Sequence, residues 1–290
     1  MNIYRNQFKR EDIFICSHYT HKNFDKKVSV YHVLIEKKCY PKGCVEFVDS
    51  CKLKSRCPKG FKKVNDRCEN CKFYNEEKIV NIPKPVSQTM YAEFTEQLEE
   101  FSEWIQKKIR RKIQFWGSIN SVKPHLEKKV YPGKEILLQR GFIVSFKSGY
   151  IDKDFLEDYT YLLLNGREFQ NIKPLPGDEV EFKGRLFINK GRIILTHPSN
   201  YLIMNRKNQG SVEDFDITTA NITGSTIDVQ MDKCFNCEKG ILIDVSDKKV
   251  NKTYRRIFCM KGIADPKDCY YYALIQEDKK LNEDNENEED

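Results

Sequence analysis

Eleven cysteines, divided into two groups, constrain this chain of 290 residues more than any other feature. Seven lie between Cys16 and Cys71, four lie between Cys234 and Cys269, and the long stretch between the groups has none. The segment Met1–Arg10 contains basic residues, but no apolar segment follows it as in a secretory signal. We therefore expect a cytoplasmic protein. Because the cytoplasm keeps thiols reduced, clustered cysteines there usually hold metal, and we expect a metal-binding module at each end of the chain.

The C-terminal group has the spacing of a metal knuckle. Cys234, Cys237 and Gly240 form a Cys-x2-Cys-x2-Gly turn, and two strand-like runs separate it from Cys259 and Cys269. Such a turn places two thiolates on one tight loop, and we expect its glycine to need a positive φ. The pattern resembles a zinc ribbon, in which two loops each supply two ligands, although the second pair is spaced Cys-x9-Cys. We expect a four-cysteine zinc site here, and the alternative is four buried, reduced thiols.

The N-terminal group offers more ligands than one metal ion can use. Its thiols are Cys16, Cys39, Cys44, Cys51, Cys57, Cys68 and Cys71. Two zinc ions would occupy them, and so would one zinc ion with a [4Fe–4S] cluster, although no Cys-x2-Cys-x2-Cys run is present. Zinc is the favoured alternative. His18, His21 and His32 lie in the same region, and we expect each to be an ordinary surface or packed residue.

A long amphipathic helix is predicted after the first group. Pro83 and Pro85 predict an irregular linker, and Ser87 or Thr89 can cap the helix that follows. Apolar residues then recur three and four positions apart, as on one helical face. They are Tyr91, Phe94, Leu98, Phe101, Ile105 and Ile109. Acidic residues crowd the start and basic residues the end, which matches the helix macrodipole.

The middle of the chain has a pattern of strands. Strand-like runs at 113–122, 136–146 and 158–164 precede a short segment at 166–172, and a hairpin of two further strands runs to about 195. Five strands with a small element between the third and fourth are typical of the OB-fold. The sequences Pro-Gly-Asp178-Glu-Val180, Phe-Lys-Gly184-Arg and Gly191-Arg192-Ile-Ile-Leu resemble the fourth and fifth strands of nucleic-acid-binding OB-folds, as in single-strand-binding proteins.

The charge pattern and the resemblance point to the same partner. The net charge is +7, and residues 105–149 carry eleven Lys or Arg against two acidic residues, which favours a polyanion. In an OB-fold, aromatic rings stack on bases while basic side chains contact phosphates. The resemblance therefore implies single-stranded DNA or RNA as partner. The candidate contacts are Phe115, Trp116, Lys123, Arg140, Phe142, Phe146, Lys147, Tyr150, Tyr159, Tyr161 and Arg167. About half of these aromatics must face the core, because side chains alternate along a strand.

The predicted fold is α+β and mainly β, with a five-stranded OB-like barrel preceded by a long amphipathic helix. We expect a Cys-rich module at 1–80, linker and helix at 81–113, the barrel at 114–205, a zinc-ribbon-like module at 206–276 and a disordered acidic tail at 277–290.

Several classes of protein are excluded or disfavoured by the sequence. Mean hydropathy is −0.66 and no apolar run is long enough to span a bilayer, which excludes a membrane protein. No known catalytic motif is present, so binding is favoured over catalysis. Two alternatives stay open. One is an iron–sulfur protein serving as a redox or accessory subunit of an enzyme complex, and the other is a zinc-stapled adaptor between proteins.

Overall fold

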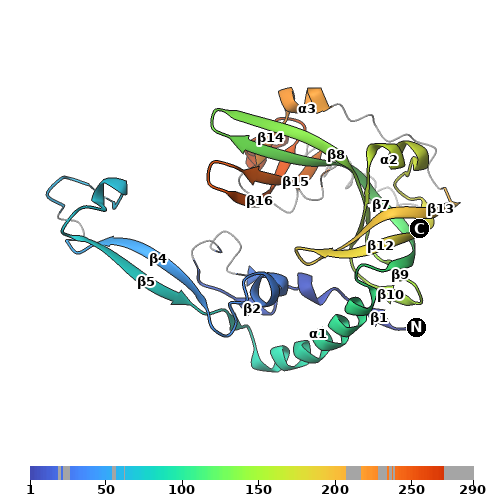
Figure 1. Ribbon diagram of the computed structural model, residues 1–290, viewed down its shortest axis with the longest axis horizontal. Coiled ribbons are helices and arrows are strands. Elements are labelled where there is room, and N and C mark those ends of the chain that lie inside the picture. Colours follow the sequence, from blue (N-terminus) through green and yellow to red (C-terminus); the bar gives the residue numbers. More distant parts are fainter. Residues whose placement is uncertain are drawn as a thin grey trace, which may run out of the picture. The chain divides into compact units, whose positions relative to one another are not determined.

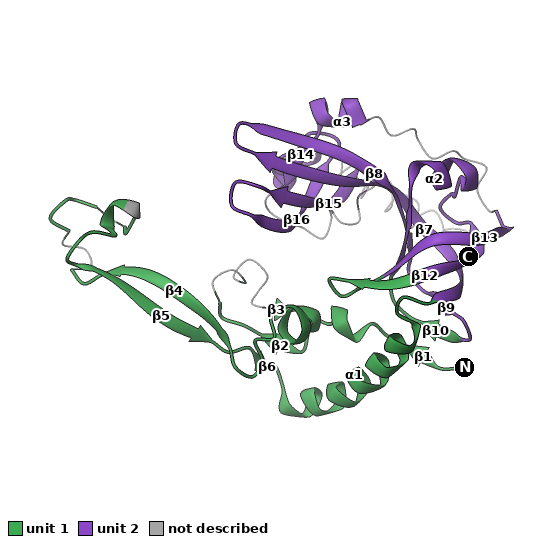
Figure 2. Cartoon of the chain, in the orientation of Figure 1, with its two compact units in different colours: residues 1–111, 154–159, 186–193 green, residues 112–153, 160–185, 194–290 purple. Residues whose placement is uncertain are grey.

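The computed structural model describes residues 1–18, 21, 27–53, 57–61, 63–206, 217–227, 234, 237 and 239–270. The acidic tail predicted at 277–290 lies outside them. The fold is mainly β, and the chain divides into two compact units. The first comprises Met1–Arg111, Asp154–Tyr159 and Leu186–Ile193, and the second comprises Lys112–Lys153, Thr160–Arg185 and Ile194–Asp290 (Figure 2). No helix of the described residues is long and apolar enough to cross a membrane.

Short strands, one hairpin and one long helix make up the first unit (Figure 1). Its strands are β1 (Ile3–Tyr4), β2 (Phe14–Ile15), β3 (Lys27–Val28), β4 (Cys44–Cys51), β5 (Tyr74–Asn81), β6 (Lys84–Pro85) and β10 (Asp154–Leu156), and its helices are η1 (Gln7–Lys9), η3 (Tyr31–Glu36), η4 (Asp66–Cys68) and α1 (Gln88–Lys108). The linker prediction was wrong in part, since Pro85 pairs with Phe14 across β6 and β2. A proline is tolerated there because β6 is an edge strand.

Helix α1 starts at its expected cap and is held by aromatic contacts. The Ser87 side chain accepts a hydrogen bond from the Met90 backbone N–H, which satisfies one of the free donors of the first turn. Near the other end, Trp104 stacks on Tyr4 with ring centroids 4.3 Å apart. The Trp104 Nε1 also donates to Asp154 Oδ2 at 2.8 Å. These contacts attach the end of the helix to β1 and β10 within the first unit.

The second unit contains the predicted strands and several others. Its strands are β7 (Lys112–Tyr131), β8 (Lys134–Phe146), β9 (Gly149–Ile151), β11 (Thr160–Leu164), β12 (Glu179–Asn189), β13 (Arg192–Asn205), β14 (Ser225–Ile227), β15 (Gly240–Asp247) and β16 (Lys252–Cys259), and its helices are α2 (Gly166–Ile172), α3 (Ile217–Thr223) and η5 (Pro266–Asp268). The turn-proximal residues of β12 and β13 belong to the first unit. Strand β9 lies in the stretch between the second and third predicted strands, where the sequence pattern gave no strand.

Strand β7 organises the pairing of the second unit. It pairs antiparallel with β8, β9 and β12 and parallel with β15. β13 lies between β12 and β11, and β11 pairs with β8. The rings of Phe115, Phe146 and Phe182 meet in the core, with Phe115 4.7 Å from Phe146 and 5.3 Å from Phe182 between centroids. A Cβ at Gly149 would lie 2.5 Å from the Phe115 ring, so only glycine fits beside this core.

Both long strands extend well beyond the length predicted for a barrel. The register of β7 and β8 shifts between His125 and Leu126, opposite Gly141, which marks a β-bulge. Beyond this bulge the two strands continue as a second hairpin arm. Leu126 and Val130 of this arm pack with Ile243 and other apolar residues of β15 and β16 in a separate core. The extension of β7 therefore provides the support for the C-terminal strands.

Asp178 anchors the turn before β12. Its side chain is fully buried and accepts hydrogen bonds from the Leu175 backbone N–H at 3.0 Å and from Arg206 Nε and Nη2 at 3.2 and 2.9 Å. A buried carboxylate is tolerated only when it is paired and hydrogen-bonded in this way. The Pro-Gly-Asp turn is thus fixed by a contact with Arg206, directly after β13.

We predict that Asp178→Ala lowers the free energy of unfolding by about 2–3 kcal/mol, because it leaves a buried N–H and a guanidinium without their acceptor. Denaturant unfolding of the purified chain measures this loss. The exposed Lys183, on the strand β12 that follows this turn, is the control, since Lys183→Ala is expected to change stability by less than about 0.5 kcal/mol. Equal effects of the two substitutions would contradict the anchoring role of Asp178.

Candidate functional site

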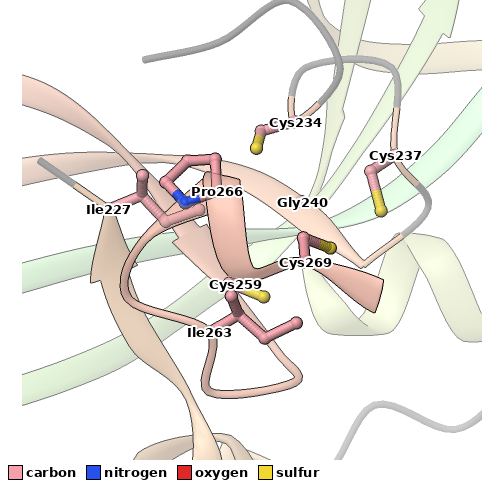
Figure 3. Close-up of a pocket in the computed structure, with 8 residues that line it drawn as sticks. All are labelled: Ile227, Cys234, Cys237, Gly240, Cys259, Ile263, Pro266 and Cys269. Atoms are coloured by element: carbon pink, nitrogen blue, oxygen red, sulfur yellow. The ribbon is translucent and has the colours of Figure 1, made fainter. Parts of the chain in front are cut away.

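Four cysteines distant in sequence line one small pocket in the second unit. Cys234, Cys237, Cys259 and Cys269 surround it together with Gly240, Ile227, Ile263 and Pro266. Figure 3 shows the four sulfur atoms around the same space. Cys234 and Cys259 are buried and the other two are half-buried, and all four are free thiols. The structure thus brings the predicted C-terminal cysteines together, which spacing alone left open.

Two turns of the same form carry Cys237 and Cys259, two of the four thiols. The Gly240 N–H donates to the Cys237 carbonyl at 3.1 Å, and the Gly262 N–H donates to the Cys259 carbonyl at 3.2 Å. Each turn therefore has the form Cys-x2-Gly, one entering β15 and one leaving β16. The sequence analysis compared only cysteine spacings and missed Gly262. A search for the second Cys-x2-Gly would have found it.

The role expected for Gly240 was wrong in its mechanism. Gly240 is not among the residues with positive φ, whereas Gly262 has φ of 75°. A Cβ at Gly240 would instead lie 2.0 Å from the Cys234 carbonyl oxygen. Glycine is required at 240 because the first knuckle folds closely over the start of β15, and at 262 because the second turn is left-handed.

Lys123 of β7 holds the first knuckle in place. Its Nζ donates to the carbonyl oxygens of Cys237 and Gly240, each at 2.8 Å. We had predicted a phosphate contact for Lys123, but its half-buried ammonium is engaged within the protein. This cation therefore binds the backbone of the turn that carries Cys237.

The seven N-terminal cysteines separate into two sets. Cys16 and Cys39 are buried in the core of the first unit and Cys44 packs against them. Burial and the neighbouring Cys16 raise the pKa of the Cys39 and Cys44 thiols. Cys51 ends the strand that Cys44 begins, and at about 3.3 Å per residue the two lie roughly 23 Å apart. One metal ion therefore cannot use both.

The second set gathers at the far end of the hairpin of β4 and β5. It consists of Cys51, Cys57, Cys68 and Cys71. Two tight turns shape this end, since the Gly60 N–H donates to the Cys57 carbonyl at 3.0 Å and the Cys71 N–H to the Cys68 carbonyl at 2.8 Å. Among the described residues, no three His, Cys, Asp or Glu side chains are arranged to hold a metal ion as they stand.

Several side chains that were predicted to contact nucleic acid instead contact other residues of the protein. Phe115 and Phe146 are fully buried in the core, so the prediction that they contact bases was wrong. Phe142 stacks on Phe169 with centroids 3.6 Å apart. Arg140 Nε donates to Glu127 Oε2 at 2.7 Å. These side chains therefore contact other residues of the protein, because the phenylalanines pack inside it and a neighbouring carboxylate binds Arg140.

Other candidates remain accessible. Trp116 is 42% exposed and lies against Tyr150, with ring centroids 5.1 Å apart. Lys147 and Arg167 are exposed, and Tyr161 is half-buried. Tyr159 is exposed but belongs to the first unit.

Exposed basic residues share the sheet face of Trp116. The register sets Lys112 opposite Arg185 and Gln114 opposite Lys183, and alternation puts these side chains on one face with Trp116. Lys112, Lys183 and Arg185 are exposed, and none forms an ion pair with another described residue. None of the three was among the predicted contacts, which came from the first three predicted strands and the segments beside them.

Comparison with protein-family models, curated proteins and solved structures finds no match.

We predict that Lys123→Met loosens the first knuckle, because two hydrogen bonds from a charged donor are lost. In reduced protein freed of metal with a chelator, Cys237 should be alkylated about tenfold faster, the equivalent of about 1.4 kcal/mol. Alkylation rates at each cysteine are measured by mass spectrometry. Lys134→Met, at an exposed position of β8, is the control, and an unchanged rate at Cys237 in Lys123→Met would contradict the role of Lys123.

Proposed function

We propose that this chain is a metal-stapled protein that binds single-stranded nucleic acid through an OB-like barrel. The pairing of the second unit supports the barrel, because the neighbours run from β7 through β8, β11, β13 and β12 and return to β7. In chain order, helix α2 lies between the third of these strands, β11, and the fourth, β12. Both the order and the position of the helix are those of the OB-fold.

The observation that carries the nucleic-acid proposal is the exposed Trp116, which lies beside the half-buried Tyr150 on a sheet face with basic residues at one end. An exposed Trp beside a Tyr offers rings on which bases stack, whatever their sequence. Lys112, Lys183 and Arg185 lie along the same face, within reach of a phosphate backbone. Glu179 and Glu181 lie on the same face of β12, so Trp116 stands between an acidic end and a basic end, and the proposed phosphate contacts are confined to the basic end. The proposed surface therefore lies on β7, β9 and β12 rather than on β8 and β11.

The metal part of the proposal rests on the two sets of four thiols. The C-terminal set shares one pocket between two Cys-x2-Gly turns, and four thiolates are the ligand set of a structural zinc ion. The four sulfurs do not meet at one point as they stand, so zinc binding requires their side chains to rotate. The set at the hairpin end has two similar turns and the same number of thiols. A zinc ion at each place would make the protein a binding module with two staples, and it leaves the three core thiols unused.

We predict that single-stranded oligonucleotides quench the fluorescence of Trp116. The chain has two tryptophans and Trp104 is buried, so Trp104→Phe should keep the quenching and Trp116→Phe should abolish it. Trp116→Ala should weaken binding of a labelled 20-nucleotide oligothymidine about tenfold, since one stacked base contributes about 1–3 kcal/mol. Fluorescence anisotropy measures the affinity, with Tyr270→Ala as the exposed aromatic control.

The same titration tests the basic face. Lys183→Glu combined with Arg185→Glu should make the dependence of affinity on salt less steep by about two phosphate contacts, whereas Lys252→Glu, in β16, should not. If the wild-type chain binds no oligonucleotide even at about 50 mM salt, the nucleic-acid proposal fails. A zinc-containing chain without this affinity would instead fit the adaptor alternative.

We predict two zinc ions per chain in protein purified anaerobically without added metal, and no iron. Cys259→Ser should lose one zinc ion, because it removes a ligand of the C-terminal set, and Cys68→Ser should lose the other. Plasma mass spectrometry with an absorption spectrum measures both metals. About four iron atoms per chain and a visible absorption that reductant bleaches would replace the zinc proposal with the iron–sulfur alternative.

A further inference from the structure

Three histidines that the metal and nucleic-acid sites do not use lie together in the first unit. The ring centroids of His18 and His21 are 5.6 Å apart, and those of His21 and His32 are 5.1 Å apart. The His21 N–H donates to the His18 carbonyl at 2.9 Å, which closes a turn that sets the two imidazoles side by side. His32 comes from the separate short helix η3. We had expected each of the three to be an ordinary surface or packed residue, and the sequence does not show that their rings meet because they come from two segments.

One ring nitrogen of this cluster is not accounted for by packing. His21 Nδ1 is buried and has no hydrogen-bond partner in the part of the chain that is described. Burial, and then the neighbouring His32 and His18, lower the pKa of His21 to about 4. A buried nitrogen without a partner among other imidazoles needs an explanation in a folded protein.

One carboxylate orients the third ring. Glu36 Oε2 lies 3.0 Å from His32 Nδ1. Since a carboxylate can only accept, Nδ1 carries the proton and Nε2 carries the lone pair. A histidine whose other nitrogen donates to a carboxylate is the usual arrangement around a protein-bound metal ion.

We propose that His18, His21 and His32 form a nitrogen-ligated site for a divalent transition-metal ion, with Glu36 as the residue that orients His32. Two imidazoles bound to one tetrahedral ion have their ring centres roughly 5 Å apart, given metal–nitrogen distances of about 2.0–2.1 Å. The two observed separations are of this size, but the three rings do not converge on one point as they stand, so metal binding requires the rings to rotate. Imidazole ligands favour zinc, cobalt, nickel or copper over magnesium or calcium. This site is independent of the thiol sets and of the nucleic-acid proposal.

The test is a titration of the zinc-loaded full-length chain with Co²⁺. We expect one further cobalt ion per chain, with the weak visible bands of nitrogen and oxygen ligation and without the intense near-ultraviolet thiolate-to-cobalt band. His21→Gln and His32→Gln should each weaken this binding at least tenfold, and Glu36→Gln about tenfold. His197→Gln, on exposed β13, should leave it unchanged. The inference is overturned if no further cobalt binds, if the thiolate band appears with it, or if His21→Gln and His32→Gln bind as the wild type does.

A second measurement decides the question if a variant fails to fold. The chain has five histidines, so the imidazole nitrogens of the wild type can be followed individually by NMR as Zn²⁺ is added. We expect the signals of His18, His21 and His32 to shift, and those of His125 and His197 to stay. Shifts that spare His21 and His32 would refute the site.

Discussion

The pairing of β7 on both of its edges is the interaction on which the second unit depends. The first part of this strand pairs with β9 and β12 and contributes Phe115 to the core, while the part beyond the bulge opposite Gly141 pairs in parallel with β15. Lys123 lies close to this change and binds the carbonyls of the first cysteine turn. A single strand therefore links the core of the proposed barrel, the basic face and the thiol pocket.

The parts of the chain that carry the two thiol sets are stabilised in different ways. Around the C-terminal set, β15 and β16 are supported by β7 and by a core that includes Leu126, Ile243 and Phe258. The other set lies at the end of β4 and β5, a two-stranded hairpin whose Val45 and Phe47 are exposed. An isolated hairpin of two strands is marginally stable in water. Metal would therefore complete a folded region in the first case and would hold the region together in the second.

The sequence predicted the parts of the fold that depend on local pattern. The Ser87 cap, the strands around Asn189 and Gly191, and the two runs that became β15 and β16 all follow from periodicity and turn residues. It failed where distant residues decide. Nothing local indicates that β7 continues past Val122 to pair with β15, or that Phe115 rather than Trp116 faces the core. For the same reason the grouping of the seven N-terminal cysteines needed the separation of Cys44 from Cys51 along β4.

A metal ion bound by the four thiols would explain why these glycines and this lysine occur together at the pocket. In the proposed zinc site the four sulfurs would be thiolates, and the apolar lining of Ile227, Ile263 and Pro266 could not offset their charge. The closeness of Gly240 to Cys234 folds the backbone around the sulfurs. Lys123 supplies a cation at the carbonyl side of the same turn. Four reduced thiols in an apolar core would need neither the close fit at Gly240 nor the Lys123 ammonium, whereas four thiolates around a metal ion would use both.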